Sequence, residues 1–253
     1  MISARKGSRT EQQSAGDERP TAAARALSLI LERGARVQAP AVEAYVKRLR
    51  HSHPDATPAD VVTKLEKHYL AAVTASGAAV GSAAALPGIG TLTALSAVAG
   101  ETVVFLEATA VFVLAVAEVH GIPAGHRERR RALVLAVLVG DEGRQAVRDL
   151  VGTARTGGGW LGESAATMPL PAVAQLNNRL VRYFVKRYAL RRSVMTFGKL
   201  LPMGIGAVIG GGGNRVMGKK IIANAHQAFG PTPTRWPVSL HVLPSARLSS
   251  ADG

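Results

Sequence analysis

The feature that most constrains this chain is a run of 32 residues, 69–100, that carries no formal charge. Within it, the segment Pro-Gly-Ile-Gly at 87–90 is a turn signal, because Pro and Gly both interrupt helices. Apolar residues continue to about His120, where Gly-Ile-Pro at 121–123 ends the pattern. Each arm is roughly 26 to 30 residues long, and at about 1.5 Å per residue either arm could cross a hydrocarbon layer of roughly 30 Å. The sequence therefore predicts a helical hairpin that hides slim apolar side chains from water, in a soluble bundle or in a membrane.

The apolar residues of the chain are mostly small. Hydrophobic residues make up 47% of the chain but aromatic residues only 4%, and there are 27 Gly. Small residues let helix backbones approach closely, and we expect such packing at Gly77 and Gly81 and again at Gly206 and Gly210. The glycine-rich segment 204–215 also resembles a phosphate-binding loop. It lacks a Lys-Ser/Thr pair directly after the last Gly and a strand before the loop, so close helix packing is the better interpretation.

Helical periodicity dominates the chain, and no segment alternates with a period of two for long. The predicted fold class is all-α, a helical bundle around the Gly/Ala-rich apolar hairpin. Residues 1–20 are too polar to offset the entropy of ordering and predict a disordered tail. Residues 21–56 predict an N-terminal helical extension, 57–229 the main helical domain, and 230–253 a loose C-terminal tail. The strongest helix start is Thr-Pro-Ala-Asp at 57–60, which offers an N-cap hydroxyl and Pro at the first helical position.

The chain carries a net charge of +14 that is unevenly distributed. Between Glu163 and Asp252 there is no Asp or Glu, although that stretch holds twelve Lys and Arg residues. Such a one-sided field indicates an anionic partner, either lipid headgroups or nucleic acid. The alternative is an Arg-rich surface without a specific partner. The polar start of the chain has no apolar signal segment, so we predict no secretory signal and a cytoplasmic location.

A basic amphipathic helix is predicted from Leu176 to Leu201. Its apolar residues gather on one face and most of its cations on the other, which is typical of a helix on a membrane surface. We predict that anionic lipid is bound by Arg179, Arg182, Lys186, Arg187 and Arg191. Nucleic-acid phosphates would suit the same cations, but the few aromatic residues do not form a stacking platform. Nucleic acid is therefore the less favoured partner, and a plain solvated helix face is the remaining interpretation.

Two carboxylates interrupt the second, apolar arm, where an unpaired charge is costly. With the turn near Gly88, Glu107 comes level with His68 or Tyr69, and Glu101 with Ala75 or Ser76. We take His68, Glu101, Glu107 and Asn214 as a candidate buried polar site. It serves either as a structural hydrogen-bond cluster, which we favour, or as an ion, proton or ligand site.

Metal and thiol chemistry have little support in the sequence. The pattern His-x-His-x-Asp at 51–55 could supply metal ligands, but a Pro-containing cap loop explains it better. There is no Cys, and hence no disulfide or thiolate chemistry. We predict no metal site and no cofactor.

The order of these features resembles the EcsC family of bacterial proteins. The resemblance covers roughly residues 60–229 and rests on the hairpin, the Gly-Asp-Glu-Gly loop at 140–143, the basic helix and the segment 201–215. It implies membrane association, an activity that is not established, and a transporter-type protein partner, because the family is named after a protein encoded beside an ABC transporter. The N-terminal extension and the Gly157–Gly159 linker depart from the family pattern. No catalytic residue is carried over.

Taken together, the sequence predicts a helical accessory or interaction protein on the cytoplasmic side of the membrane, peripheral or inserted by its hairpin. A link to transport or envelope processes is what the resemblance implies. Two alternatives stay open. One is a soluble helical enzyme with a Glu/His/Asn site in the bundle core, and the other is a basic nucleic-acid-binding protein.

Overall fold

The computed structural model describes residues 40–84, 91–122, 124–151, 159–161, 168–195 and 206–237. These residues are mostly helical and contain no strand, so the predicted all-α fold class is confirmed. A helix over residues 40–52 precedes the main elements. The main helices are α2 (Pro58–Ala84), α3 (Thr91–Val119), α4 (Arg127–Val139), α5 (Asp141–Val151), α7 (Leu170–Met195) and α8 (Gly206–Phe229).

The start of α2 is fixed by the capping signal that the sequence contains. The backbone N–H of Thr57 donates to Oδ2 of Asp60 at 2.9 Å, and the backbone N–H of Asp60 donates to Oγ1 of Thr57 at 3.2 Å. This reciprocal arrangement satisfies backbone donors that the first helical turn would otherwise leave unpaired. The hydrogen bonds from Thr57 lower the pKa of the Asp60 carboxyl.

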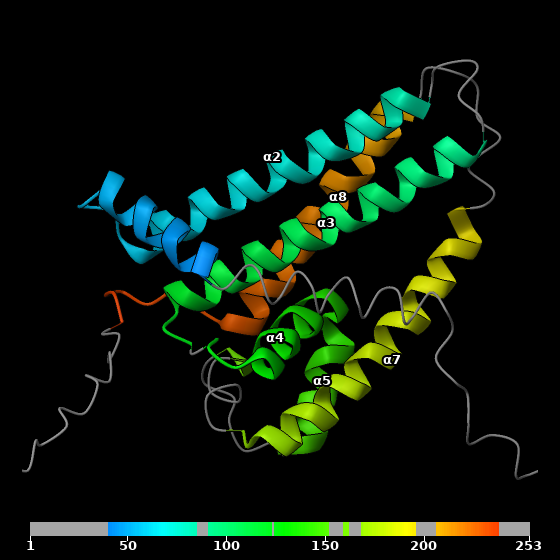
Figure 1. The fold of residues 1–253 in the computed structure, drawn as a ribbon. Coiled ribbons are helices and arrows are strands. Elements are labelled where there is room, and N and C mark those ends of the chain that lie inside the picture. The colour runs from blue at the N-terminus through cyan, green and yellow to red at the C-terminus, as the bar shows by residue number, and fades with distance from the viewer. Residues whose placement is uncertain are drawn as a thin grey trace, which may run out of the picture.

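The predicted hairpin is present, with α2 and α3 lying antiparallel and in contact. Figure 1 also shows α8 running along both helices, so that the three form one elongated unit. The contact of α2 with α8 is more extensive than its contact with α3. The first arm of the hairpin therefore has a second partner from far along the chain.

Two glycines of α8 set its distance from α2. A Cβ atom built on Gly218 would lie 3.0 Å from Leu70 Cδ2, and one built on Gly211 would lie 3.3 Å from both the Cβ of Ala78 and the carbonyl oxygen of Thr74. A side chain at either position would require its neighbours on α2 to move, which is the close packing expected of small residues. The two contacts are seven residues apart along α8, which corresponds to about two helical turns.

The remaining helices form a more conventional core. Residues 132–139 of α4 are all buried, and α4 packs against α3, α5, α7 and α8. Leu133, Leu135 and Val137 have no solvent exposure. In Figure 1, α4 and α5 lie beside one half of the elongated unit, whereas α7 runs from that half toward the other end.

Residues 230–237 pack on the bundle, which corrects the expectation of a loose tail that begins at Gly230. Nε1 of Trp236 donates to the carbonyl oxygen of Ala56 at 3.2 Å, and the Arg50 guanidinium lies 4.1 Å from the centre of the indole ring. Pro237 packs so closely on Gly121 that a Cβ built there would lie 2.6 Å away. These residues form a strap, residues 230–237, that holds the helix at 40–52 on the bundle. The predicted tail at 1–20, much of the extension and residues 238–253 lie outside the described residues.

One stretch among the described helices, Gly100–Val119, is long and apolar enough to cross a membrane. Inside the protein, 56% of this stretch is buried. The core helix of a soluble protein satisfies the same criterion of length and composition, so this finding does not by itself establish a transmembrane segment.

Candidate functional site

Two members of the predicted polar site meet between α2, α3 and α8. Nδ2 of Asn214 on α8 donates to Oε1 of Glu101 on α3 at 2.8 Å, and to the carbonyl oxygen of Val73 on α2 at 3.1 Å. One side-chain amide therefore joins all three helices. Thr74 lies at the same level of α2, and its Oγ1 is buried with no hydrogen-bond partner among the described residues. We call Thr74, Glu101 and Asn214 the polar belt.

The chemistry of the polar belt is dominated by the Glu101 carboxyl. Burial raises its pKa, and the hydrogen bond from Asn214 opposes that rise in part. A carboxyl in this environment exchanges its proton closer to neutral pH than an exposed one does. The arrangement can hold a proton and can fix α8 against the hairpin. The three residues of the belt include no second acidic or basic group to complete a catalytic pair.

The other two predicted members of the site lie elsewhere, which corrects the expectation from the sequence. His68 is exposed, and its Nδ1 lies 2.6 Å from the hydroxyl of Tyr45 on the helix at 40–52. Glu107 is also exposed, on a face of α3 that the other described helices leave open. The buried contact at this level of the hairpin joins Tyr69 of α2 to Thr109 of α3, with the Tyr69 hydroxyl 2.9 Å from Oγ1 of Thr109. Sequence reasoning therefore found the right level of the hairpin but the wrong faces of both helices.

The Tyr69 contact was not predicted. Its ring stacks on Phe112 with centroids 4.7 Å apart, and burial raises the pKa of its hydroxyl to about 12. The phenol thus stays neutral and serves as a hydrogen-bonding core residue. The sequence did contain a signal for this contact, since Tyr69 is an aromatic residue at the first position of the uncharged run 69–100. Tyr and Phe supply the largest apolar areas in a core of small residues, which favours their burial.

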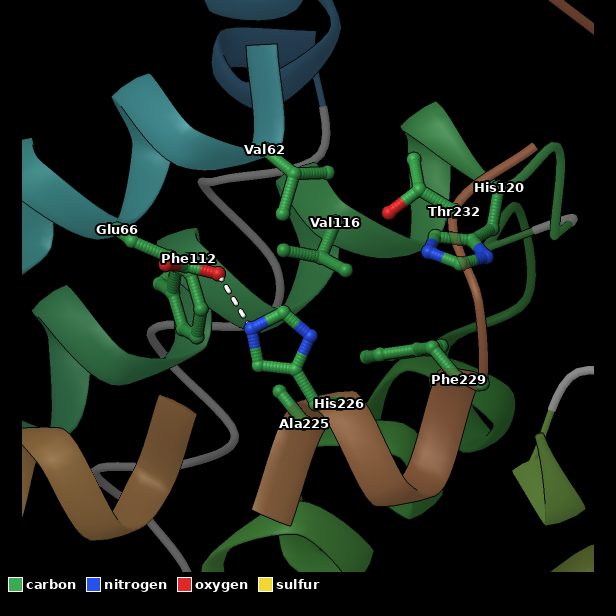
Figure 2. Close-up of a pocket in the computed structure, with 10 residues that line it drawn as sticks. Val62, Glu66, Phe112, Val116, His120, Ala225, His226, Phe229 and Thr232 are labelled. Carbon is green, nitrogen blue, oxygen red and sulfur yellow. Dashed lines mark ion pairs between the residues drawn. The ribbon is translucent and has the colours of Figure 1, made fainter. Parts of the chain in front are cut away.

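A second group of polar residues lies at the opposite end of α8. Nε2 of His226 and Oε1 of Glu66 are 2.7 Å apart and line a small cavity with His120 and Phe229. Figure 2 shows His226 facing Glu66, and the neighbouring rings of His120 and Phe229, whose centroids are 5.5 Å apart, on the side of His226 away from Glu66. Burial, and then the charge of His226, lower the pKa of His120.

This cavity is too small for a substrate. It measures about 10 Å³, which is about the room that one water molecule needs. Among the described residues, no three metal-binding side chains come together. The His51 ring instead donates from Nδ1 to the carbonyl oxygen of Lys47 at 2.8 Å, as expected of a residue that ends a helix.

The predicted lipid-binding cations lie on α7. Arg182 is exposed, whereas Arg179 is half-buried and lies 3.9 Å from Asp149 of α5. That contact reduces the charge that Arg179 offers to a partner. The side chains of Lys186, Arg187 and Arg191 lie outside the described residues.

The structure adds exposed cations on α8. Arg215, Lys219 and Lys220 are exposed, and Val216 between them is 71% exposed. No Asp or Glu occurs anywhere in the sequence of α8. We call Arg215, Val216, Lys219 and Lys220 the α8 basic face. The acid-free stretch after Glu163 was the sequence signal for it.

The predicted packing glycines have different outcomes. Gly77 is buried in α2, and Gly81 lies one turn further along the same helix and is half-buried. Gly206 and Gly210 belong to the first turns of α8, but their packing lies outside the described residues. The contacts that the structure does describe are those of Gly211 and Gly218.

Comparison with known proteins identifies no relative. No family model matches the chain, and neither does any curated protein or solved structure. The resemblance to the EcsC family therefore stays a prediction from the sequence, and the function has to be argued from the described residues themselves.

Proposed function

We propose that this protein is an accessory or interaction protein that binds the anionic surface of a membrane from the cytoplasmic side. The observation that supports this function best is the α8 basic face. It presents three cations and an exposed Val216 on a helix that carries no acidic residue.

Anionic lipid is the ligand that fits both properties of this face. Each Lys or Arg near an anionic surface contributes about 1 kcal/mol of attraction, and an apolar side chain among them gains by leaving water. Nucleic-acid phosphates would engage the cations, but they offer no apolar environment for Val216. Arg182 on α7 adds a further exposed cation.

A surface-bound protein fits these residues better than one that spans the membrane. More than half of the apolar stretch Gly100–Val119 is already buried by other helices, so its apolar side chains have less to gain from lipid. The exposed Glu107 lies in the same stretch and would be costly in hydrocarbon. A membrane-embedded partner of transporter type, as the family resemblance implies, is part of the proposal.

Vesicle sedimentation tests the proposed function. The purified protein should pellet with vesicles of phosphatidylcholine and phosphatidylglycerol, pellet much less with phosphatidylcholine alone, and lose binding as salt screens the charges. The variant Lys219→Glu/Lys220→Glu should bind at least about tenfold more weakly, since it reverses two cations that each contribute about 1 kcal/mol. A matched control, Arg48→Glu/Lys67→Glu, makes the same change in net charge at exposed positions of other helices and should retain most of the binding.

Two results would contradict the proposal. One is equal weakening by both double variants, because binding would then depend on net charge and not on the α8 basic face. The other is an absence of vesicle binding together with salt-sensitive retention of a DNA fragment, which would support the nucleic-acid alternative.

A further inference from the structure

Charge is segregated along the length of the unit formed by α2, α3 and α8. The polar belt lies at one level on all three helices, because Asn214 contacts both Glu101 and Val73. Beyond this level, residues 75–84 of α2, 91–100 of α3 and 206–213 of α8 carry no Asp, Glu, Lys, Arg or His. We call these three segments the uncharged end.

The surface of the uncharged end suits lipid. Ala75, Ala79, Gly212 and Gly213 are exposed and have no polar side chain. A hydroxyl that does occur on this part of α2 is satisfied within the helix, since Ser82 donates to the carbonyl oxygen of Ala78 at 2.8 Å. A hydroxyl that bonds back to its own helix costs little in hydrocarbon, where an unpaired polar group costs several kcal/mol.

The length of the uncharged end matches half of a bilayer. At about 1.5 Å per residue, its segments on α2 and α3 each extend roughly 15 Å. The hydrocarbon core of a bilayer is about 30 Å thick, so one leaflet contributes roughly 15 Å. The uncharged end is therefore long enough to enter one leaflet and too short to cross both.

The charged residues next to the uncharged end are placed for phosphate groups. Arg215 directly follows Asn214 in the polar belt, and Lys219 and Lys220 lie one turn or more further along α8. Long cationic side chains extend toward headgroups while their stems cover apolar surface. Glu101, the only acid in the polar belt, is bound by Asn214 between the helices. In Figure 1 the C-terminal end of α7 points toward the same end of the molecule.

We propose that the uncharged end inserts into one leaflet of an anionic membrane, with Arg215, Lys219 and Lys220 at the level of the lipid phosphates. This inference rests on the proposed function and adds the orientation and depth of binding. In this orientation the long axis of the unit formed by α2, α3 and α8 passes through the membrane surface, with the uncharged end in the lipid. The helices α4 and α5 remain in water.

Depth measurement with single cysteines tests the orientation, because the natural chain contains no Cys. Ala79→Cys, Gly212→Cys and Lys67→Cys each carry an environment-sensitive fluorophore at an exposed position of the folded protein. A Cβ atom built on Gly212 would meet no heavy atom within 4 Å, so a side chain fits there. Anionic vesicles contain lipids with a spin-label quencher at the headgroup or at defined positions along the acyl chain.

The expected result is an order of depths. The label at Ala79 should shift to the blue and be quenched most by acyl-chain spin labels, and the label at Gly212 should be quenched by shallower ones. The label at Lys67 should stay accessible to iodide in water. A water-exposed label at Ala79 on protein that pellets with the vesicles would overturn the insertion but not the proposed function. Protection of Lys67 as well as Ala79 would overturn the one-leaflet depth, and failure of every labelled protein to pellet would overturn both proposals.

A pair of charge insertions provides a second test. Ala79→Asp places a carboxylate in the uncharged end, and Ala71→Asp places the same group at an exposed position of α2 on the other side of the polar belt. Because a carboxylate is expensive in hydrocarbon, Ala79→Asp should weaken partitioning into anionic vesicles about tenfold more than Ala71→Asp. Circular dichroism in buffer should show both variants folded. Equal partitioning of the two folded variants would contradict insertion.

Discussion

Asn214 and Glu101 are 113 residues apart in the sequence, yet Nδ2 of Asn214 lies 2.8 Å from Oε1 of Glu101. Replacing Asn214 with Leu would remove both hydrogen bonds and leave the half-buried Glu101 carboxyl without this donor, whereas the Val73 carbonyl still accepts from Oγ of Ser76. The cost of such an unsatisfied group is about 1–3 kcal/mol. We expect Asn214→Leu to lower the free energy of unfolding in urea by an amount in that range. An unchanged midpoint would show that Asn214 does not stabilise the three-helix contact.

The pH dependence of stability should report on Glu101. Because its pKa is raised in the folded state, the folded chain binds this proton more tightly than the unfolded chain. Its contribution to stability is therefore greatest below the ordinary Glu pKa and is lost as pH rises through the raised pKa. Glu101→Gln should remove that decline and gain stability at neutral pH relative to the natural chain. Glu107→Gln makes the same chemical change at an exposed position of α3 and serves as the matched control.

Glycine substitutions on α8 should differ in sign according to their neighbours. Gly211→Leu forces atoms against Ala78 and the backbone of Thr74, and overpacking of this kind typically costs about 1–3 kcal/mol. Gly213→Ala meets no heavy atom within 4 Å and should gain about 0.4–1 kcal/mol, because it restricts the unfolded chain. Thermal unfolding of the two variants measures both effects. A gain in both would mean that α2 and α8 are not in close contact.

The strap should control the helix at 40–52. Trp236→Ala removes the hydrogen bond to Ala56 and the contact with Arg50. Hydrogen exchange followed by mass spectrometry should then show faster exchange in residues 40–52 and little change in α4. Arg50→Ala removes only the ring contact and should have the smaller effect. Unchanged protection of residues 40–52 in Trp236→Ala would contradict a clamping role for the strap.

Acid should weaken the end of the bundle that contains His120. Burial, followed by the charge of His226, lowers the pKa of the His120 imidazole in the folded chain. Its contribution to stability is complete above the ordinary His pKa and is lost as pH falls through the lowered pKa. An NMR titration should give His120 a pKa below that of a histidine in a short, unfolded peptide. His226→Gln should bring it partly back, since burial remains, and an ordinary pKa in the natural chain would contradict the buried placement.

The parts of the fold that local sequence determines were predictable. The hairpin follows from the absence of charge over 69–100 and the Pro-Gly turn, and the capping of α2 follows from Thr57 and Asp60. The pairing of α8 with α2 was not predicted. It depends on contacts such as that of Gly218 with Leu70. These residues are far apart in the sequence, and helical periodicity gives no information about which distant helices pair.

The candidate site was predictable in composition but not in geometry. Glu101 and Asn214 were identified as polar residues in apolar surroundings, and the structure brings them together. The prediction for Glu107 was wrong because the apolar residues around it in the sequence suggested burial, whereas its face of α3 is exposed. His68 failed for a similar reason, since its partner Tyr45 belongs to a helix whose position the pattern could not give. Trp236 was missed because neighbouring Pro residues suggested a tail.

The pairing of α2 with α8 has a consequence for synthesis of the chain. Val73 and Asn214, which meet between these helices, are 141 residues apart. A ribosome that adds about 5–20 residues per second needs on the order of ten seconds to make the intervening polypeptide. Throughout that interval the side of α2 that α8 will cover has no permanent neighbour, so the nascent protein emerges with an apolar helical face waiting for a segment that has not yet been translated.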